Sequence, residues 1–354
     1  MYVQPASTVV HVEGLSHGVD PHSGIKASQP ANREVFLVRW RETLAREQLP
    51  PGRHLFLAKD RAQLKKSVLI VDRRPPHTDQ DAGSRAIWQL MRVLHLQGFS
   101  IKFWADEAER NPAYVHLLEM HGIELLNATD PDAEFDAWIA AHGCYIDHVV
   151  LSRPLVAEKY IDSVRRRTAS KVLYYGHDVH HVRIERQFAL TGEQGLRAHP
   201  RHLQSVGEGL WRQSDLVLYP THEETQHVNR WLEAAGHSLR ASTIPLFAYE
   251  DIPPLLEGPD HRIVDRHDVV FVGGFAHAPN EDAALWFTRE VWPHVHLGEP
   301  SLRLCLVGSD PSEALRALAG PGVLVTGYVS ESALIEHYNR ARVAVAPLRF
   351  GSGM

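Results

Sequence analysis

The sequence is poor in cysteine, which excludes a framework of disulfides. Its 354 residues include only Cys144 and Cys305, far apart in the chain. Both lie in apolar contexts ("HGCYIDHVV" and "LRLCLVG"), so we expect them to be small core residues and not disulfide partners or zinc ligands. A chain without structural disulfides fits a reducing compartment, so we expect a cytoplasmic protein.

Long apolar runs are absent as well. No run reaches the roughly 18 residues that a membrane span needs. The N-terminus also lacks the basic and then apolar pattern of a secretion signal. Any membrane contact is therefore expected to be peripheral, at the inner face of the membrane. The net charge of -6 argues against a general nucleic-acid binder, so nucleic acid is not an expected partner.

What the chain does have is a repeated alternation of strands and helices. From "SVLIVD" onward, short β-branched runs alternate with amphipathic stretches, which is typical of parallel βαβ units. The pattern breaks in a stretch rich in proline and glycine and then restarts, which predicts two Rossmann-like domains with doubly wound parallel sheets. The predicted parts are an N-terminal extension with a helix over 31–47, a first domain, a linker and a second domain, over residues 1–66, 67–245, 246–267 and 268–354.

Glycines follow the predicted strands of the second domain. Gly273 and Gly274, then Gly308, then Gly327 each come directly after a strand. A tight turn needs glycine for steric reasons alone. Because carboxyl ends of parallel strands meet at one sheet edge, these loops also converge, and their N–H groups can bind an anion. "PLRFGSGM" is a fourth such loop, in which Arg349 is either a phosphate ligand or a solvated surface arginine.

The stretch "YYGHDVHHVR", residues 174–183, is dense in groups that bind metals or move protons. His177 with His180 or His181 has a spacing that brings two imidazoles onto one helical turn. No third ligand pair with comparable spacing is present, so we expect no metal. His177 and Asp178 end a predicted strand and are the candidate catalytic residues.

Several motifs, in order, resemble a known family. "FVGGFAHAPNEDAALWFTREVWPHV", "LRLCLVGS" and "VLVTGYVSESALIEHYNRARVAVAPLRFGSG" resemble the donor-binding half of retaining family 4 glycosyltransferases (glycosyl transferases group 1) of the GT-B fold. "DRRPPHTDQDAGSRAIWQLMRVL" and "VLYYGHDVHH" resemble its acceptor half, in the bacterial O-antigen and polysaccharide branch. The resemblance covers about residues 67 to 354. It implies two Rossmann-like domains facing a cleft, the second incomplete at its C-terminus.

The N-terminal extension resembles a different family. "VVHVEGLSHGVDP" and "NREVFLVRWRETL" are similar to the tail of a family 2, GT-A type, glycosyltransferase domain. Residues 1–66 would then be a remnant of a preceding catalytic domain. His11 would be a metal ligand without its partners, so no working metal site is expected there.

The resemblance to family 4 assigns roles to single residues. It implies that His177 hydrogen-bonds the donor sugar or the reacting phosphate, that Asp178 orients the sugar or the acceptor, and that His180 and His181 support them or face the acceptor. The acceptor-side loop corresponds to Asp81, Gly83 and Ser84, where Asp81 or Ser84 also caps the following helix.

The donor side is assigned in the same way. Gly273 and Gly274 match a phosphate-facing loop, and Gly308 belongs to the same group of glycine turns. Gly327 and Tyr328 match a loop at the nucleobase. "FAHAPNED" lacks the family's usual Arg and Lys, so the diphosphate is expected at Arg349 and at the turn of Gly351, Ser352 and Gly353.

The resulting prediction is a glycosyltransferase of hexosyltransferase type. It would move a sugar from a nucleotide-diphosphate donor to a polysaccharide or lipid-linked glycan, with retention and without a metal or other cofactor. One alternative is a GT-B epimerase or hydrolase of nucleotide sugars. The other is an inactive fragment, because the family's acidic donor-site motif would lie beyond Met354.

Overall fold

The computed structural model describes residues 24–50, 52–58, 60, 62–107, 109, 111–126, 134–193, 195, 199–238, 240–245 and 266–351. Several predictions lie outside these residues: the strand "VVHV", His11, most of the 246–267 linker, Ser352 and Gly353.

The first domain is built on a seven-stranded sheet. All of its pairings are parallel, in the order β3-β2-β1-β4-β5-β6-β7. The strands are β1 Ser67–Asp72, β2 Ser100–Ala105, β3 Glu124–Leu125, β4 His148–Ser152, β5 Lys171–Tyr175, β6 Leu216–Tyr219 and β7 Ala241–Thr243. The chain order reverses between β1 and β4, and ligands of such sheets bind outside the carboxyl ends of the strands at this switch point.

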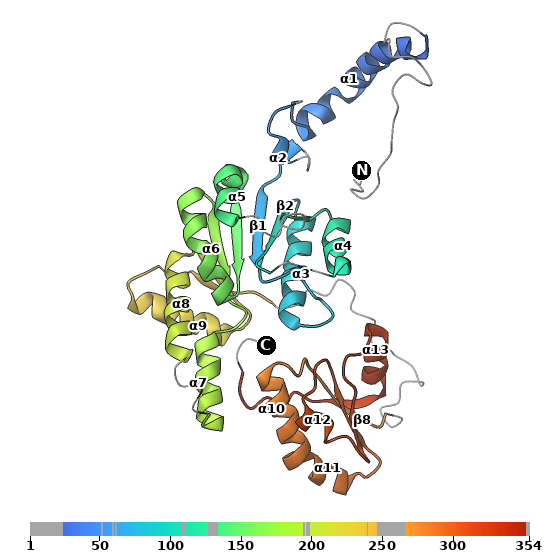
Figure 1. The fold of residues 1–354 in the computed structure, drawn as a ribbon, viewed down its shortest axis with the longest axis vertical. Helices are drawn as coiled ribbons and strands as arrows, with labels where there is room; N and C mark the ends of the chain where they lie inside the picture. Colours follow the sequence, from blue (N-terminus) through green and yellow to red (C-terminus); the bar gives the residue numbers. More distant parts are fainter. Residues whose placement is uncertain are drawn as a thin grey trace.

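Helices cover both faces of this sheet (Figure 1). They are α3 Ala82–Leu96, α4 Pro112–Met120, α5 Phe135–His142, α6 Pro154–Arg167, α7 His180–Thr191, α8 His199–Gln213 and α9 His222–Ala234, with the short η2 Gly143–Tyr145. Alternate residues of β1 enter two cores, as the period of a strand requires. Val68 and Ile70 pack with α3 and α4, whereas Leu69 and Val71 pack with α5, α6, α8 and α9.

The second domain has a four-stranded parallel sheet in the order β10-β9-β8-β11. Its elements are β8 Asp268–Val272, α10 Ala278–Trp286, the π-helical η6 Phe287–Val291, α11 Trp292–Gly298, β9 Arg303–Val307, α12 Glu313–Arg316, β10 Val323–Val325, α13 Glu331–Arg340 and β11 Ala341–Ala344. The predicted helix over 280–292 thus runs on to Gly298 through a π-helical turn. Pro293 lacks the N–H that an α-helical turn would use, which explains the wider turn.

The extension before β1 contains η1 Gly24–Ala27, α1 Ser28–Glu47 and α2 Leu55–Ala58. The predicted helix over 31–47 is confirmed as α1, which buries none of its side chains and points away from the first domain (Figure 1). Lys102 on β2 anchors the segment after α1: it pairs with Asp60 and lies 5.2 Å from the ring of Phe56. None of the described helices is long and apolar enough to cross a bilayer.

The sequence pattern missed two helices, α7 and α8, which lie between β5 and β6. Their buried positions are sparse: His181 is the one buried residue of α7, and α8 buries Val206, Leu210 and Trp211 amid polar residues. A second expectation was also wrong. Cys144 is exposed in η2, whereas Cys305 lies in the core, where burial raises the pKa of its thiol to about 11.

Candidate functional site

The switch point of the first sheet carries an ion pair between a buried aspartate and a half-buried arginine. Asp72, the last residue of β1, accepts a hydrogen bond of 2.8 Å from Nε of Arg153, the residue that follows β4. The same oxygen of Asp72 accepts from the backbone N–H of Arg73 at 2.7 Å. The ends of β1 and β4 are therefore joined at the point where a ligand is expected.

His177 lies beside this pair, two residues after β5. Its imidazole is buried against Tyr175, with ring centroids 4.4 Å apart, and its Nε2 lies 2.8 Å from Oγ of Ser152. Its Nδ1 is buried without a hydrogen-bond partner. Burial, and after it the charge of Arg153, lowers the pKa of His177 to about 3. At neutral pH the site thus contains an uncharged imidazole, one of whose ring nitrogens is buried without a hydrogen-bond partner.

Backbone geometry marks the same corner. Arg153 has φ 65° and His177 has φ 58°, a region that residues other than glycine seldom adopt. Each such residue costs of order 1–3 kcal/mol and persists where the surroundings enforce it, often at functional sites. In the part of the chain that the structure describes, four residues other than glycine have a positive φ. Two of them, Arg153 and His177, lie next to each other at this corner.

Asp178 is held by its own neighbours. Its carboxylate accepts from Nε of Arg183 at 2.6 Å and forms an ion pair with His180. Burial alone would raise the pKa of Asp178, but the hydrogen bonds and charges of His180 and Arg183 hold it below its usual range. Asp178 thus fixes the start of α7, and its predicted role towards the sugar or acceptor stays a prediction.

A capping box on another helix supports this turn. Thr221 caps α9, as the motif "THEE" predicts: its Oγ1 accepts from the backbone N–H of Glu224 at 3.3 Å and donates to Oε2 of the same residue at 2.8 Å. The buried Glu224 also accepts from the backbone N–H of Val179 at 3.1 Å. The start of α9 therefore holds the segment that carries His177 and Asp178.

The acceptor-side loop residues gather around His177. Asp81 is the cap of α3: its carboxylate accepts from the N–H and from Oγ of Ser84, each at 2.7 Å. A Cβ on Gly83 would lie 3.0 Å from Nη2 of Arg153 and 3.3 Å from Nδ1 of His177. Any larger side chain at Gly83 would thus crowd the unpartnered imidazole nitrogen and the guanidinium.

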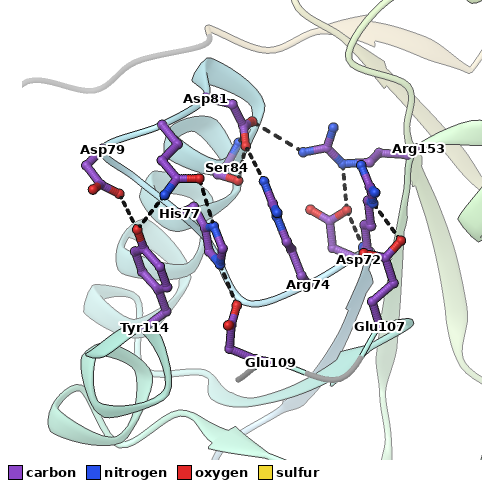
Figure 2. A network of polar contacts seen from close by, with 12 residues as sticks. Asp72, Arg74, His77, Asp79, Asp81, Ser84, Glu107, Glu109, Tyr114 and Arg153 are labelled. Carbon is purple, nitrogen blue, oxygen red and sulfur yellow. Dashed lines mark hydrogen bonds and ion pairs between the residues drawn. The ribbon is translucent and has the colours of Figure 1, made fainter. Parts of the chain in front are cut away.

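A polar network fixes the loop between β1 and α3 (Figure 2). His77 stacks on Tyr114 with ring centroids 3.7 Å apart and pairs with Glu109. The hydroxyl of Tyr114 donates to Oδ1 of Asp79 at 2.9 Å. Burial, and then this hydrogen bond, raises the pKa of Tyr114 to about 12. The sequence reasoning named none of these residues, although the polar run "HTDQD" was a signal for them.

The glycine loops of the second domain lie together, as their positions after parallel strands predicted. The N–H of Gly273 donates to Val307 at 3.0 Å, and that of Gly308 donates to Gly327 at 3.2 Å. Gly308 needs to be glycine, because a Cβ there would lie 1.7 Å from the carbonyl oxygen of Gly273. These loops adjoin the start of α10, where N–H groups and the helix dipole favour an anion.

The two domains touch at the loops described above. The hydroxyl of Tyr328 donates to Oδ2 of Asp79 at 3.0 Å, and Nη1 of Arg186 on α7 donates to the carbonyl of Gly351 at 3.1 Å. Gly274 also faces Gln80, whose carbonyl oxygen would lie 3.6 Å from a Cβ on the glycine. Arg349 forms an ion pair with Asp282 on α10, with Nε 2.8 Å from Oδ2, so Asp282 competes with any phosphate for this guanidinium.

The predicted role of His181, to support His177 and Asp178 or to face the acceptor, stays a prediction. His181 is buried between helices, with its ring 6.2 Å from Trp211 and 5.6 Å from His227, and burial lowers its pKa to about 4.

In the part of the chain that the structure describes, no three His, Cys, Asp or Glu side chains could hold a metal ion. Metal independence remains a prediction. Sequence reasoning also missed Asp72, Ser152 and Arg153, whose signal was the polar residues at the ends of "SVLIVD" and "DHVVLSR".

Comparison with known proteins agrees with this architecture. Residues 266–354 match the family model described as Glycosyl transferases group 1. The whole structure is similar to an alpha,alpha-trehalose 6-phosphate synthase from Burkholderia multivorans, with a TM-score of 0.53 and 10% identity over 82% of this chain and 79% of that one. The chain has the GT-B fold. The predicted fold class is therefore confirmed.

A second solved structure is similar to the same extent. It is a UDP-forming alpha,alpha-trehalose-phosphate synthase from Burkholderia xenovorans in complex with glucose-6-phosphate, with a TM-score of 0.51 and 11% identity over 82% of this chain and 80% of that one. None of the curated proteins matches the chain. The findings support a GT-B glycosyltransferase, while the O-antigen branch and the GT-A remnant remain predictions.

Proposed function

We propose that this protein is a glycosyltransferase that moves a sugar from a nucleotide-diphosphate donor to a polysaccharide or lipid-linked glycan, with retention and without a metal. The observation that carries the proposal is the free Nδ1 of His177. It belongs to a buried, uncharged imidazole beside Gly83, near the loops through which the two domains touch. An imidazole in this state can hydrogen-bond a sugar hydroxyl without adding a charge next to the reacting carbon.

The second domain supplies what the leaving group needs. Transfer breaks the bond between the anomeric carbon and a phosphate oxygen, and the departing nucleotide diphosphate takes up the negative charge. Fixed N–H groups and helix N-termini stabilise such charge. The start of α10, which lies beside the loops of Gly273, Gly308 and Gly327, supplies the positive end of a helix dipole for this charge. The similar synthase from Burkholderia xenovorans is described as UDP-forming, which supports a nucleotide diphosphate as product here.

The carboxylates around His177 support retention. Inversion requires a general base that deprotonates the acceptor opposite the leaving group. Asp72, Asp81 and Asp178 lie at this corner, and each is hydrogen-bonded to an arginine. A carboxylate whose oxygens are held by a guanidinium is a poor base, because the pairing stabilises its charged form.

A thermal-shift screen tests the proposal. A ligand that binds only the folded state raises the unfolding midpoint in proportion to its occupancy. We expect at least one of UDP, GDP, dTDP, CDP or their sugar conjugates to raise the midpoint of the 354-residue protein. The same ligand should raise it less for His177→Asn. If every ligand leaves the midpoint unchanged while circular dichroism shows a folded protein, the proposal fails.

A further inference from the structure

Arg153 and Ser152 form a corner that is tied to the turn carrying His177. The N–H of Arg153 donates to the carbonyl oxygen of Tyr175 at 3.1 Å, and Oγ of Ser152 lies 2.8 Å from Nε2 of His177. The side chain of Arg153 reaches the opposite way, to Asp72 at the end of β1 and to Asp81 at the cap of α3 (Figure 2). One residue therefore connects the surroundings of both ring nitrogens of His177.

We infer that Arg153 decides which ring nitrogen of His177 carries the proton: Nε2–H donates to Ser152, and the lone pair of Nδ1 is presented to the sugar as a hydrogen-bond acceptor. Arg153 is thus a positioning residue, since it acts through His177. The ligand, a sugar hydroxyl, rests on the proposed function, whereas the protonation pattern rests on the geometry of the free protein.

Charges close to Nδ1 carry the inference. Nη2 of Arg153, Oδ1 of Asp81 and Nδ1 of His177 all lie within 3.3 Å of the point that a Cβ on Gly83 would occupy. A cation there opposes a proton on Nδ1, and a carboxylate favours one. Oδ1 of Asp81 is already bound by the N–H of Ser84 at 2.7 Å and by Arg153 at 3.5 Å. The guanidinium therefore dominates.

The other charged groups that face His177 do not outweigh the effect of Arg153 on Nδ1. Asp178 would favour a proton on the ring, but its carboxylate is paired with His180 and Arg183. After burial, the charge of Arg153 has the largest effect on the pKa of His177 and lowers it; the opposing effects of Asp178 and Asp81, which raise this pKa, are smaller. The hydroxyl of Ser152 can donate or accept, so it adapts to the tautomer that the charges set.

The tautomer can be read without any ligand. Protein labelled with 15N-histidine gives two-bond 1H–15N correlation spectra in which protonated and unprotonated ring nitrogens differ clearly in shift. The protein has 24 histidines, so the loss of one signal set in His177→Asn assigns His177. At pH 7.5 we expect Nε2 protonated and Nδ1 unprotonated in the wild-type protein. A protonated Nδ1 in the wild-type protein would overturn the inference.

Variants of Arg153 and Asp81 test whether the tautomer of His177 depends on the charge of Arg153 or only on the intact structure around it. Arg153→Met should shift His177 towards the tautomer with a proton on Nδ1, because Asp81 then acts alone. Arg153→Gln keeps a polar group of similar reach but removes the charge, so it should shift the tautomer in the same direction. This variant replaces Arg153→Met in the experiment if the Met variant does not fold. Asp81→Asn should leave the wild-type tautomer. Arg165→Met is the matched control, since Arg165 pairs with Asp215 elsewhere in the domain. An unchanged tautomer in both neutral Arg153 variants, or a change in Asp81→Asn, contradicts the inference.

A binding measurement connects the inference to the proposed function. With UDP-glucose as probe, calorimetry should show at least a tenfold weaker affinity for Arg153→Met than for the wild-type protein, and an unchanged affinity for Arg165→Met. If the wild-type protein has the expected tautomer but binds neither UDP-glucose nor any other ligand of the thermal-shift screen, the proposed function fails while the assignment of the proton stands. If it binds UDP-glucose equally well with and without Arg153, the positioning role fails while the proposed function stands.

Discussion

The hydroxyl of Tyr328 donates a 3.0 Å hydrogen bond to Oδ2 of Asp79, and this contact joins the second domain to the loop after β1. The other oxygen of Asp79 accepts from Tyr114 on α4 at 2.9 Å. One carboxylate therefore connects the loop expected at the nucleobase with the loop expected at the acceptor. Loss of this carboxylate should remove the hydrogen-bond acceptor of both tyrosine hydroxyls.

The first prediction concerns these two hydroxyls. In Asp79→Asn the pKa of Tyr328 should fall towards its usual value, because the hydrogen bond and the charge of Asp79 raise it. The pKa of Tyr114 should fall from about 12 but stay above 10, because burial is the largest cause of its shift. NMR of tyrosine labelled at Cζ measures both. Asp162→Asn, on the exposed side of α6, is the control. Unchanged tyrosine titrations in Asp79→Asn would show that the contact is absent in solution.

Gly83→Ala should separate folding from function. Alanine is favoured over glycine within a helix by up to about 1 kcal/mol, so the variant should fold at least as well as the wild-type protein unless the new contacts cost more. Its Cβ would crowd Arg153 and His177 at 3.0 and 3.3 Å, and we expect donor affinity to fall at least tenfold. Gly209→Ala in α8 is the matched control, since nothing lies within 4 Å of a Cβ there. Urea unfolding and calorimetry together give the answer; wild-type affinity in Gly83→Ala would refute the placement of the sugar.

Gly308→Ala should damage the second domain itself. The Cβ would overlap the carbonyl oxygen of Gly273 at 1.7 Å, and Gly308 has φ +156°, so the loops after β8 and β9 must separate. We expect a loss of stability of about 3 kcal/mol, the upper range of overpacking in a dense region. Gly298→Ala, with open space around its Cβ, should change stability little. Denaturant unfolding of both variants checks the difference, and equal stabilities would contradict the backbone contact.

His177 should make the protein sensitive to acid. Its pKa is about 3 when folded, against the usual 6.5, so between these values the unfolded chain binds a proton that the folded protein does not. Stability from this residue is therefore complete above about pH 6.5 and is lost as the pH falls towards 3. At pH 5 the loss is about 2 kcal/mol. His177→Asn, chosen because asparagine tolerates positive φ, should lose that much less stability between pH 7.5 and pH 5. Urea unfolding at both pH values measures the difference. If the free energy of unfolding falls equally with pH in the wild-type protein and in His177→Asn, the low pKa of His177 is refuted.

The sequence predicted the architecture well because regular patterns determine it. The β-branched apolar run "SVLIVD", the proline at the start of α6 and the "THEE" box indicated elements through local chemistry. The helices α7 and α8 were not predicted, because few of their positions are apolar. His177 was singled out because its motif is dense in polar groups, whereas Ser152 and Arg153 gave only the weak signal of two polar residues at the end of an apolar run. Their roles arise only when parallel pairing brings β4 next to β1 and β5.

The same reason explains the limits on the donor side. The glycine turns were visible in the sequence, but the pairing of Arg349 with Asp282 joins residues 67 positions apart. The contact between Tyr328 and Asp79 spans 249 positions. No periodicity records such contacts, because the first depends on the folding of the second domain and the other on how the two domains come together.

The most direct test of the central claim is an acceptor-dependent transfer assay. The protein is incubated with nucleotide sugars, each with and without an array of glycan and lipid-linked acceptors, and products are identified by mass spectrometry and by NMR of the new linkage. We predict release of a nucleotide diphosphate together with a product one sugar longer, with the anomeric configuration of the donor retained, and loss of both in His177→Asn. Free sugar or an epimer formed without any acceptor, or no turnover of any donor by folded protein, would contradict it.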